Sequence, residues 1–231
     1  MIIFDLGGVL LQEADIHLSR VIPAHVDVER INGQIPRIFN RMFDFADLIF
    51  KRPCKKDWFM GTITGAEIVQ KIQVCIDLDE YSSFFKNMQE KNLIQHGSEF
   101  ILLPHKLISL TFIDLDGFEF VKKCKKSGRR IMILSNWDAQ SFALIKNKFS
   151  ELFNLFDPND IVIPAYAGFM KPEIEIYRHM IEKLKLDSSK TFFVDDVAKN
   201  IATAKECGIR GVVHCNWKQT EQELLHSGLQ I

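Results

Sequence analysis

Residues 192–209 read FFVDDVAKNIATAKECGI, so an apolar run, an acidic pair and a helical pattern follow one another directly. Continuous rather than alternating apolar residues are typical of a strand that is buried on both faces of a parallel sheet. The helical pattern starts near Ala198 and stops at Gly208, a residue type that ends helices because it tolerates positive φ. A buried strand followed at once by a helix is the repeating unit of a parallel α/β sheet.

Four further apolar runs have the same character, at Ile2–Phe4, Ile131–Leu134, Ile161–Ile163 and Gly211–Val213. A second helical pattern, with apolar residues at i, i+3, i+4 and i+7, runs from Tyr177 to Leu184, and Pro172 is expected at its first position. The sequence therefore predicts an α/β fold with a Rossmann-like, doubly wound parallel sheet.

The region from about Gln12 to Pro104 has a different pattern. It is rich in Phe, contains no comparable buried-strand run, and carries a T-x-x-E capping box at Thr64 and Glu67 ahead of apolar residues at helical spacing. We expect an α-helical cap domain, residues 13–104, inserted into a core domain formed by residues 1–12 and 105–231.

Composition excludes several classes of protein. The 231 residues contain 29 Lys+Arg and 30 Asp+Glu, a net charge of −1, which argues against nucleic acid as a partner. The five cysteines are odd in number, scattered and never in a C-x-x-C pair, which favours reduced thiols and a cytoplasmic location. No stretch of about 18 apolar residues is present, so no membrane association is expected.

Asp5 ends the first apolar run and is followed by Gly7 and Gly8. Residues at the carboxyl ends of parallel strands face the crevice where α/β folds bind ligands. Two glycines let the backbone approach an anion or a metal closely. A turn or helix-capping aspartate is the structural alternative.

Two weaker features concern anion binding. Ser135 and Asn136 follow the Ile131–Leu134 run, where a hydroxyl and backbone N–H groups can hold a phosphate oxygen, although Ser-Asn is also ordinary turn chemistry. Lys171 precedes a predicted helix, where a cation is disfavoured by the helix dipole, so an anion nearby would explain it. A solvated surface lysine is the alternative.

Asp195 and Asp196 end a buried strand, with Asn200 four residues further on. Two adjacent carboxylates at the end of an apolar strand are costly without a cation, and their hard oxygen ligands suit Mg²⁺. This is the strongest single signal for a functional site.

Together these segments carry a family resemblance. FDLGGVLL (4–11), ILSN (133–136), GFMKPE (168–173) and the stretch quoted first resemble, in order, the four motifs of the haloacid dehalogenase (HAD) superfamily. The chain is most similar to the subfamily I phosphatases with a helical cap, and within them to the glucose-1-phosphate phosphatase-like group. In the cap the resemblance depends mainly on GTITGAEI (61–68).

The resemblance implies a Mg²⁺-dependent phosphatase that acts on a small phosphorylated metabolite, such as a sugar phosphate. Asp5 would be the nucleophile and form an aspartyl-phosphate. Mg²⁺ would be held by Asp5, the backbone carbonyl of Gly7 and Asp196, with Asp195 either a ligand or directly behind one. The phosphoryl oxygens would be bound by Ser135, the Asn136 backbone and Lys171, the last of which is also a catalytic residue.

Gly7 departs from the family pattern. Most of these phosphatases carry an aspartate there that protonates the leaving group, a role worth about 10²–10⁴-fold. A slow enzyme, a good leaving group such as a sugar 1-phosphate, or another donor (Asp44, Asp47 or His17) would each account for the glycine. The alternative is a weak or inactive HAD-fold protein that binds a phosphorylated ligand or a partner protein. A phosphotransferase is less favoured, because it usually needs the missing residue.

Two patterns imitate functional motifs. The segment DLDG (114–117) resembles the first motif, but Leu110–Ile113 is expected to lead into a helix, which makes Asp116 a helix-start residue. The basic run at 122–126 is expected to be a solvated helix end, because lysines there are favoured by the helix dipole. Sequence leaves open whether the protein is a monomer or a homodimer.

Overall fold

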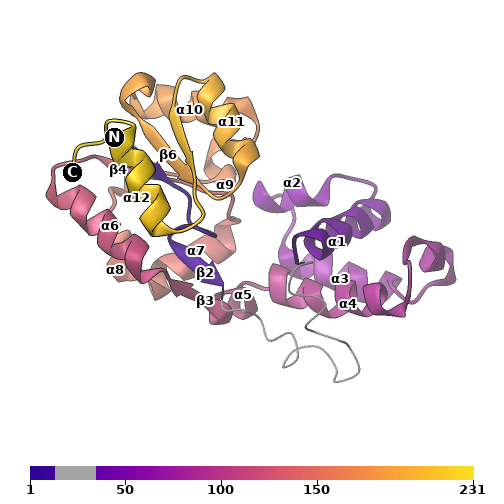
Figure 1. The fold of residues 1–231 in the computed structure, drawn as a ribbon. Coiled ribbons are helices and arrows are strands. Elements are labelled where there is room, and N and C mark those ends of the chain that lie inside the picture. Colours follow the sequence, from indigo (N-terminus) through magenta and orange to yellow (C-terminus); the bar gives the residue numbers. More distant parts are fainter. Residues whose placement is uncertain (14–34) are drawn as a thin grey trace. The chain divides into compact units, whose positions relative to one another are not determined.

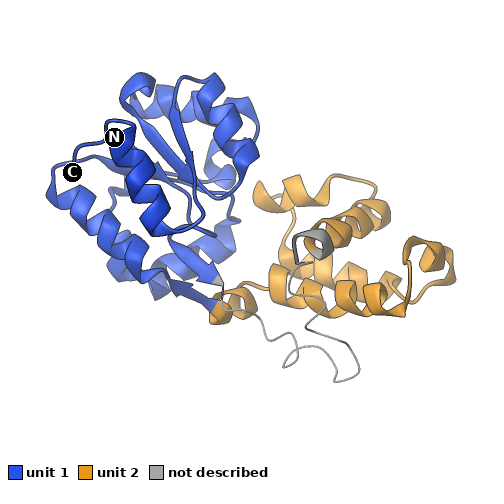
Figure 2. Cartoon of the chain, in the orientation of Figure 1, with its two compact units in different colours: residues 1–13, 111–231 blue, residues 14–110 orange. Residues whose placement is uncertain are grey.

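The computed structural model describes residues 1–13 and 35–231. The chain divides into two compact units (Figure 2): a sheet unit, residues 1–13 and 111–231, and a helical unit, residues 14–110. Both domain boundaries lie slightly later in the chain than the expected ones. That the helical unit acts as a cap stays a prediction.

The sheet unit contains a five-stranded sheet in the order β5-β4-β1-β6-β7, with every pair parallel (Figure 1). Its first strand in the chain, β1, lies at the centre, so that Ile3 pairs with Met132 on one side and Phe193 on the other. The apolar runs therefore predicted the strands, whose bounds are β1 Ile2–Phe4, β4 Ile131–Leu134, β5 Ile161–Val162, β6 Phe192–Asp195 and β7 Arg210–Val213.

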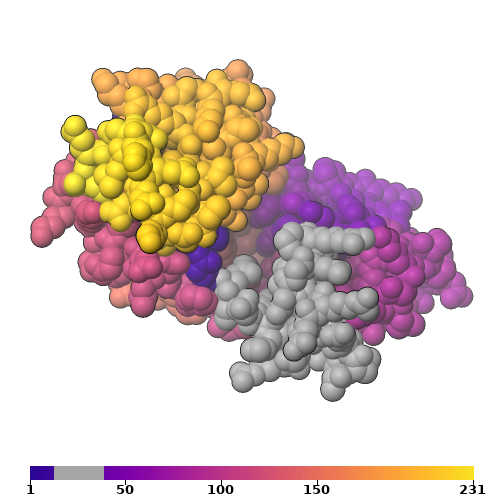
Figure 3. Space-filling model, in the orientation of Figure 1, coloured from indigo at the N-terminus to yellow at the C-terminus, as the bar shows by residue number. Residues whose placement is uncertain are grey.

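Helices cover both faces of this sheet, because successive strand residues point to opposite sides. Ile3 belongs to a buried cluster with residues of α10 (Ile174–Leu184) and α11 (Ala198–Glu206). Phe4 points the other way, and its ring contacts Phe120 of α6 (Leu115–Lys126) and Trp217 of α12 (Trp217–His226). Figure 3 shows α12, in yellow, at the surface of this unit. The doubly wound α/β prediction is confirmed.

Side-chain caps fix where several helices of the sheet unit begin. Asp138 accepts from two backbone N–H groups at the start of α7 (Ala139–Lys148). Asp114 accepts from one, the Gly117 N–H, at the start of α6, which puts Asp116 in the first turn of that helix. Pro172 was expected at the first position of α10, but that helix starts two residues later, after Glu173. The remaining short elements of this unit are α8 (Ser150–Phe153), α9 (Pro164–Ala167) and the 3₁₀ turns η4 (Pro158–Asp160) and η5 (Ser188–Lys190).

The chain passes between the two units twice, after Glu13 and before Thr111, and the strands at these two points pair as a two-stranded antiparallel sheet. It pairs β2 (Leu11–Glu13) with β3 (Thr111–Ile113). Leu110–Ile113 leads into α6, as expected, but the sequence predicted no strand at Thr111–Ile113 and none after Leu11. Each strand has only three residues, too few to show a period, and the partners are distant in the chain.

The described part of the helical unit contains helices, as predicted. The capping box is present: the Glu67 N–H donates to Thr64 Oγ1, and the Thr64 N–H donates to the Glu67 carboxylate. Phe45 packs among aromatic rings that include those of Tyr81 and Phe84. The elements are α1 (Ile35–Phe50), α2 (Cys54–Phe59), α3 (Gly65–Cys75), η3 (Asp79–Phe84), α4 (Met88–Leu102) and α5 (Pro104–Leu110).

All five cysteines are free thiols. Within residues 1–13 and 35–231, no helix combines the length and the apolar character needed to cross a bilayer. In the basic run, Lys122 and Lys123 pair with Glu119 and Glu221, so these two charges are partly compensated within the protein.

Candidate active site

Asp5 directly follows the central strand, so residues at the ends of both neighbouring strands reach it. Ser135, directly after β4, donates its hydroxyl hydrogen to Asp5 Oδ1 over 2.6 Å. The backbone N–H of Leu6 donates to the same oxygen over 2.7 Å. The other oxygen, Oδ2, lies 2.8 Å from Lys171 Nζ. Each carboxylate oxygen of Asp5 therefore has a donor, and the side chain is held in one orientation.

Lys171 bridges two acids. Its Nζ lies 2.6 Å from Asp195 Oδ2 as well as 2.8 Å from Asp5, and its side chain is only 1% exposed. Burial opposes the charged form of Lys171, but the two carboxylates outweigh that effect and raise its pKa. These two carboxylates account for a lysine at this position, and its burial shows that the solvated-surface alternative is wrong. That Lys171 binds a phosphoryl oxygen stays a prediction.

The Asn136 side chain holds the Lys171 backbone. Asn136 Nδ2 donates to the Lys171 carbonyl over 2.8 Å, and the Lys171 N–H donates to Asn136 Oδ1 over 2.9 Å. Sequence reasoning gave Asn136 only a backbone role and missed this one. The reciprocal pair joins the loop after β4 to the loop that carries the lysine.

Asp195 is completely buried, and both oxygens of its carboxylate accept hydrogen bonds. Besides Lys171, Asn200 Nδ2 contacts both oxygens at 2.9 and 3.0 Å, and the Val197 N–H donates to Oδ1 over 2.8 Å. The spacing that placed Asn200 near the acidic pair is thereby explained. Asp195 anchors Lys171 from behind and has little capacity for a further ligand.

Asp196, by contrast, is exposed and lies against the loop after β1. Gly8 has φ +72°, and a Cβ built on it would lie 2.6 Å from Asp196 Oδ2. A side chain at residue 8 would thus be strained and would collide with the carboxylate. The second glycine of the first motif permits the approach of Asp196 to the Asp5 loop.

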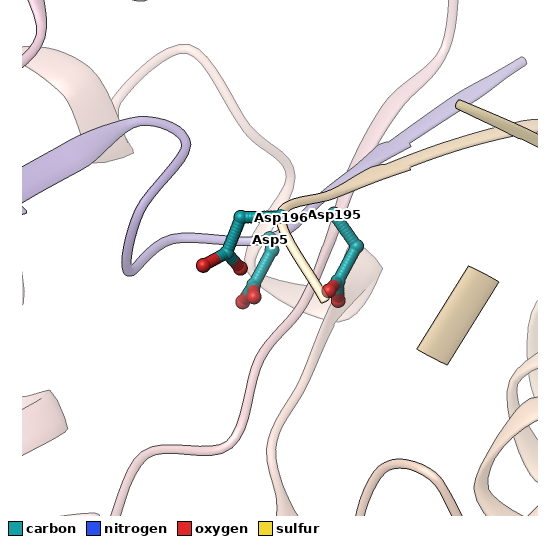
Figure 4. A group of neighbouring side chains, drawn as sticks. All are labelled: Asp5, Asp195 and Asp196. Carbon is teal, nitrogen blue, oxygen red and sulfur yellow. The ribbon is translucent and has the colours of Figure 1, made fainter. Parts of the chain in front are cut away.

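Three carboxylates converge at this edge of the sheet. Asp5, Asp195 and Asp196 each offer an oxygen, and these oxygens lie within 4.8 Å of one another (Figure 4). Burial, with a contribution from Asp195, raises the pKa of Asp5 to about 7, against the opposing effects of Lys171 and Ser135. Burial and the Asp195 charge also raise the pKa of Asp196. One lysine facing three acids leaves excess negative charge, so the donor set fits a hard divalent cation such as Mg²⁺.

Three residues were named in the sequence as candidate proton donors, Asp44, Asp47 and His17. Asp44 and Asp47 belong to α1 of the helical unit, where Asp47 Oδ1 already accepts the Cys54 N–H over 2.6 Å. Burial raises the pKa of Asp47. His17 lies outside the described residues. A role for any of them in proton transfer stays a prediction.

The model of the haloacid dehalogenase-like hydrolase family matches residues 1–208 of the chain. The chain belongs to this family. The resemblance seen in the four motifs is thus confirmed at the level of the superfamily, and the protein is a HAD-like hydrolase. Its assignment to subfamily I and to a cap type stays a prediction.

Two curated relatives are phosphatase or hydrolase proteins. The sesquiterpene phosphatase astK of Aspergillus oryzae is 29% identical over 126 residues, 51% of this chain and 62% of that protein. Bifunctional epoxide hydrolase 2 of Rattus norvegicus is 26% identical over 87 residues, 37% of this chain and 15% of that protein. The chain thus spans less than two thirds of the length of either relative.

Among solved structures, the HAD family enzyme bt-2542 of Bacteroides thetaiotaomicron is 19% identical with a TM-score of 0.60, covering 95% of this chain and 97% of that one. A further structure of bt-2542 is a complex with magnesium and inorganic phosphate, at 20% identity and TM-score 0.59. A predicted HAD-like hydrolase from Porphyromonas gingivalis is 21% identical with a TM-score of 0.58, over 97% and 96% of the chains. At these identities the likeness establishes the fold.

Proposed function

We propose that the protein is a Mg²⁺-dependent phosphatase that hydrolyses a small phosphorylated metabolite through an aspartyl-phosphate on Asp5. The observation that carries the proposal is the position of Asp5, with one oxygen bonded to Ser135 and the other to Lys171, beside the exposed carboxylate of Asp196. A nucleophile held in one orientation next to a cation and a hydroxyl donor is suited to attack a phosphate.

Mg²⁺ would be held by Asp5, Asp196 and the backbone carbonyl of Gly7. Asp195 is better suited to a supporting role, because its oxygens are already shared among Lys171, Asn200 and a backbone N–H. When bound, the metal would neutralise charge on the phosphoryl group and let the anionic nucleophile approach it. The complex of bt-2542 with magnesium and inorganic phosphate supports this choice of metal.

The residues of this chain would then act in two steps. In the first, an Asp5 oxygen bonds to phosphorus while the bond from phosphorus to the leaving oxygen breaks, and that oxygen keeps the electron pair. Lys171 and Ser135 would stabilise the transferred phosphoryl oxygens, together with the Asn136 N–H. In the second, water attacks phosphorus, the bond to Asp5 breaks, and inorganic phosphate leaves. The Asp5 carboxylate is thereby regenerated for the next turnover.

A direct test is turnover of aryl and sugar phosphates with Mg²⁺ or with EDTA. Asp5→Asn should abolish Mg²⁺-dependent turnover. The matched control is Asp116→Asn, an exposed aspartate in the look-alike segment DLDG that makes no contact with the site. Equal rates for wild type and Asp5→Asn would exclude Asp5 as the nucleophile.

Gly7 supports a second candidate, a HAD-fold protein that binds a phosphorylated ligand or a partner without turnover. Acid quenching after incubation with a ³²P-labelled ester separates the two. An active enzyme carries label on Asp5, whereas a binding protein binds inorganic phosphate and carries none. A cytoplasmic location, a sugar phosphate as substrate, and the monomeric or homodimeric state are further predictions for the same protein.

A further inference from the structure

The loops after β1 and β4 stay side by side beyond the sheet. The strands are paired in register, Phe4 with Ile133, and the first polar residues after them, Asp5 and Ser135, are hydrogen-bonded over 2.6 Å. Two residues further along each loop stand Gly7 and Trp137. A Cβ built on Gly7 has one heavy atom within 4 Å outside its own chain neighbours, and that atom is Trp137 Nε1, at 3.9 Å.

Trp137 is held from both sides. Asn136, before it, is bound to the Lys171 backbone, and Asp138, after it, accepts the N–H groups of Gln140 and Ser141. The tryptophan itself is only 8% exposed. Trp137 thus lies in a short loop whose residues on both sides of it are held by hydrogen bonds.

The N–H of the Trp137 indole has no acceptor among the described residues. Its nitrogen also differs from the buried, unpaired nitrogens of the protein, because it is not completely enclosed. Trp217 in the same unit differs, because its nitrogen is enclosed within the protein. A buried tryptophan usually finds a partner for its N–H. At Trp137 the nitrogen of this donor lies 3.9 Å from the position of a Gly7 Cβ, and Gly7 is two residues from the proposed nucleophile, Asp5.

We propose that the Trp137 Nε1–H donates a hydrogen bond to the leaving oxygen of the substrate, in the space that Gly7 leaves free. The proposal rests on the proposed phosphatase function. An indole N–H does not release its proton at neutral pH, so the leaving oxygen departs with the electron pair of the P–O bond as an anion. It takes its proton from water after release.

This step selects a class of substrate. Leaving groups that are stable as anions need a hydrogen bond but no acid, and they include glycosyl 1-phosphates, acyl phosphates, enol phosphates and diphosphates. Simple alkyl phosphates, whose alkoxide is strongly basic, would be poor substrates. Gly7 and Trp137 together therefore favour phosphates of weakly basic leaving groups.

The test is a series of aryl phosphates from 2,4-dinitrophenyl to phenyl phosphate, assayed for kcat/KM with Mg²⁺. Trp137→Phe keeps the ring and removes the N–H. We expect a loss of about 10- to 100-fold on phenyl phosphate, the size of a hydrogen bond to a charged oxygen, and little loss on 2,4-dinitrophenyl phosphate. The matched control, Trp217→Phe, should leave the dependence on the leaving group unchanged.

A second variant serves in case Trp137→Phe does not fold. Gly7→Asp fits the space, because its Cβ meets only an ordinary contact, and should raise turnover of phenyl phosphate by up to about 10²–10⁴-fold. An equal loss on every ester in Trp137→Phe, or an unchanged dependence on the leaving group in both variants, would overturn the proposal. Absence of Mg²⁺-dependent turnover of every ester by the wild type would instead overturn the phosphatase function itself.

Discussion

The sharpest consequence of the site is the energetic role of Lys171. Replacing it by Met keeps the bulk of the side chain but removes the cation from between Asp5 and Asp195, whose side chains are 10% and 0% exposed. Breaking a buried ion pair by removing one partner costs about 3–5 kcal/mol. Both carboxylates keep other donors, Ser135 for the first and Asn200 for the second, so we expect the lower end, about 3 kcal/mol.

The measurement is urea unfolding in EDTA, followed by tryptophan fluorescence. With a slope of about 1–3 kcal/mol per molar urea, a loss of about 3 kcal/mol lowers the midpoint by about 1–3 M. Lys183→Met, an exposed lysine on α10, is the control and should change stability by less than about 0.5 kcal/mol. Adding Asp195→Asn to Lys171→Met removes one of the two buried carboxylate charges that lost their cation. The double variant should therefore regain part of the lost unfolding free energy.

Mg²⁺ gives a second readout of the same perturbation. Without the lysine the three acids carry more uncompensated charge, so Mg²⁺ should raise the midpoint of Lys171→Met more than that of the wild type. A loss of less than about 1 kcal/mol in EDTA, with an equal response to Mg²⁺, would refute the reasoning that this lysine compensates buried charge.

Three further perturbations test the local structure. Gly8→Ala forces a side chain into φ +72° and against Asp196, so it should cost about 1–3 kcal/mol in urea unfolding and weaken Mg²⁺ binding in a titration; unchanged Mg²⁺ affinity would contradict the placement of Asp196. Thr64→Ala removes the cap of α3 and should lower the unfolding free energy by about 1 kcal/mol, with Thr64→Ser close to wild type. Burial raises the pKa of the Cys124 thiol to about 12, which keeps it protonated at pH 8, so iodoacetamide should label exposed Cys215 first; mass spectrometry showing the reverse order would refute this.

The sequence was enough to predict the sheet because its signal is local. Each parallel strand is a continuous apolar run, and each run ends where the residues of the site begin, as at Ile131–Leu134 before Ser135. Since strands of one sheet end at a shared edge, the order of the motifs was sufficient to bring Asp5 close to Lys171 and Asp195. The pairing of β2 with β3 carried no such signal, because strands of three residues have no recognisable period.

The family resemblance named Asp196 as a metal ligand and left Asp195 as either a ligand or directly behind one, but the residue pattern alone does not show which of the two acids is buried. The two are adjacent acids, and successive side chains of a strand point to opposite sides, so one turns into the protein and the other outward. Which one turns inward depends on Asn200 and Lys171, which lie on other elements. The side-chain role of Asn136 was missed for the same reason, since its partner is a backbone group on a distant loop.

Gly7 and Gly8 look equivalent in the sequence, yet the structure requires a glycine at only one of the two positions. Gly8 is required by its backbone, because φ is +72° and a Cβ would collide with Asp196. Gly7 has no such requirement: its φ lies outside the left-handed region, and a Cβ there would make only an ordinary contact with Trp137. Folding alone would thus accept other residues at position 7. The missing side chain there is a property of the site, and its meaning has to be sought in the chemistry of the leaving group.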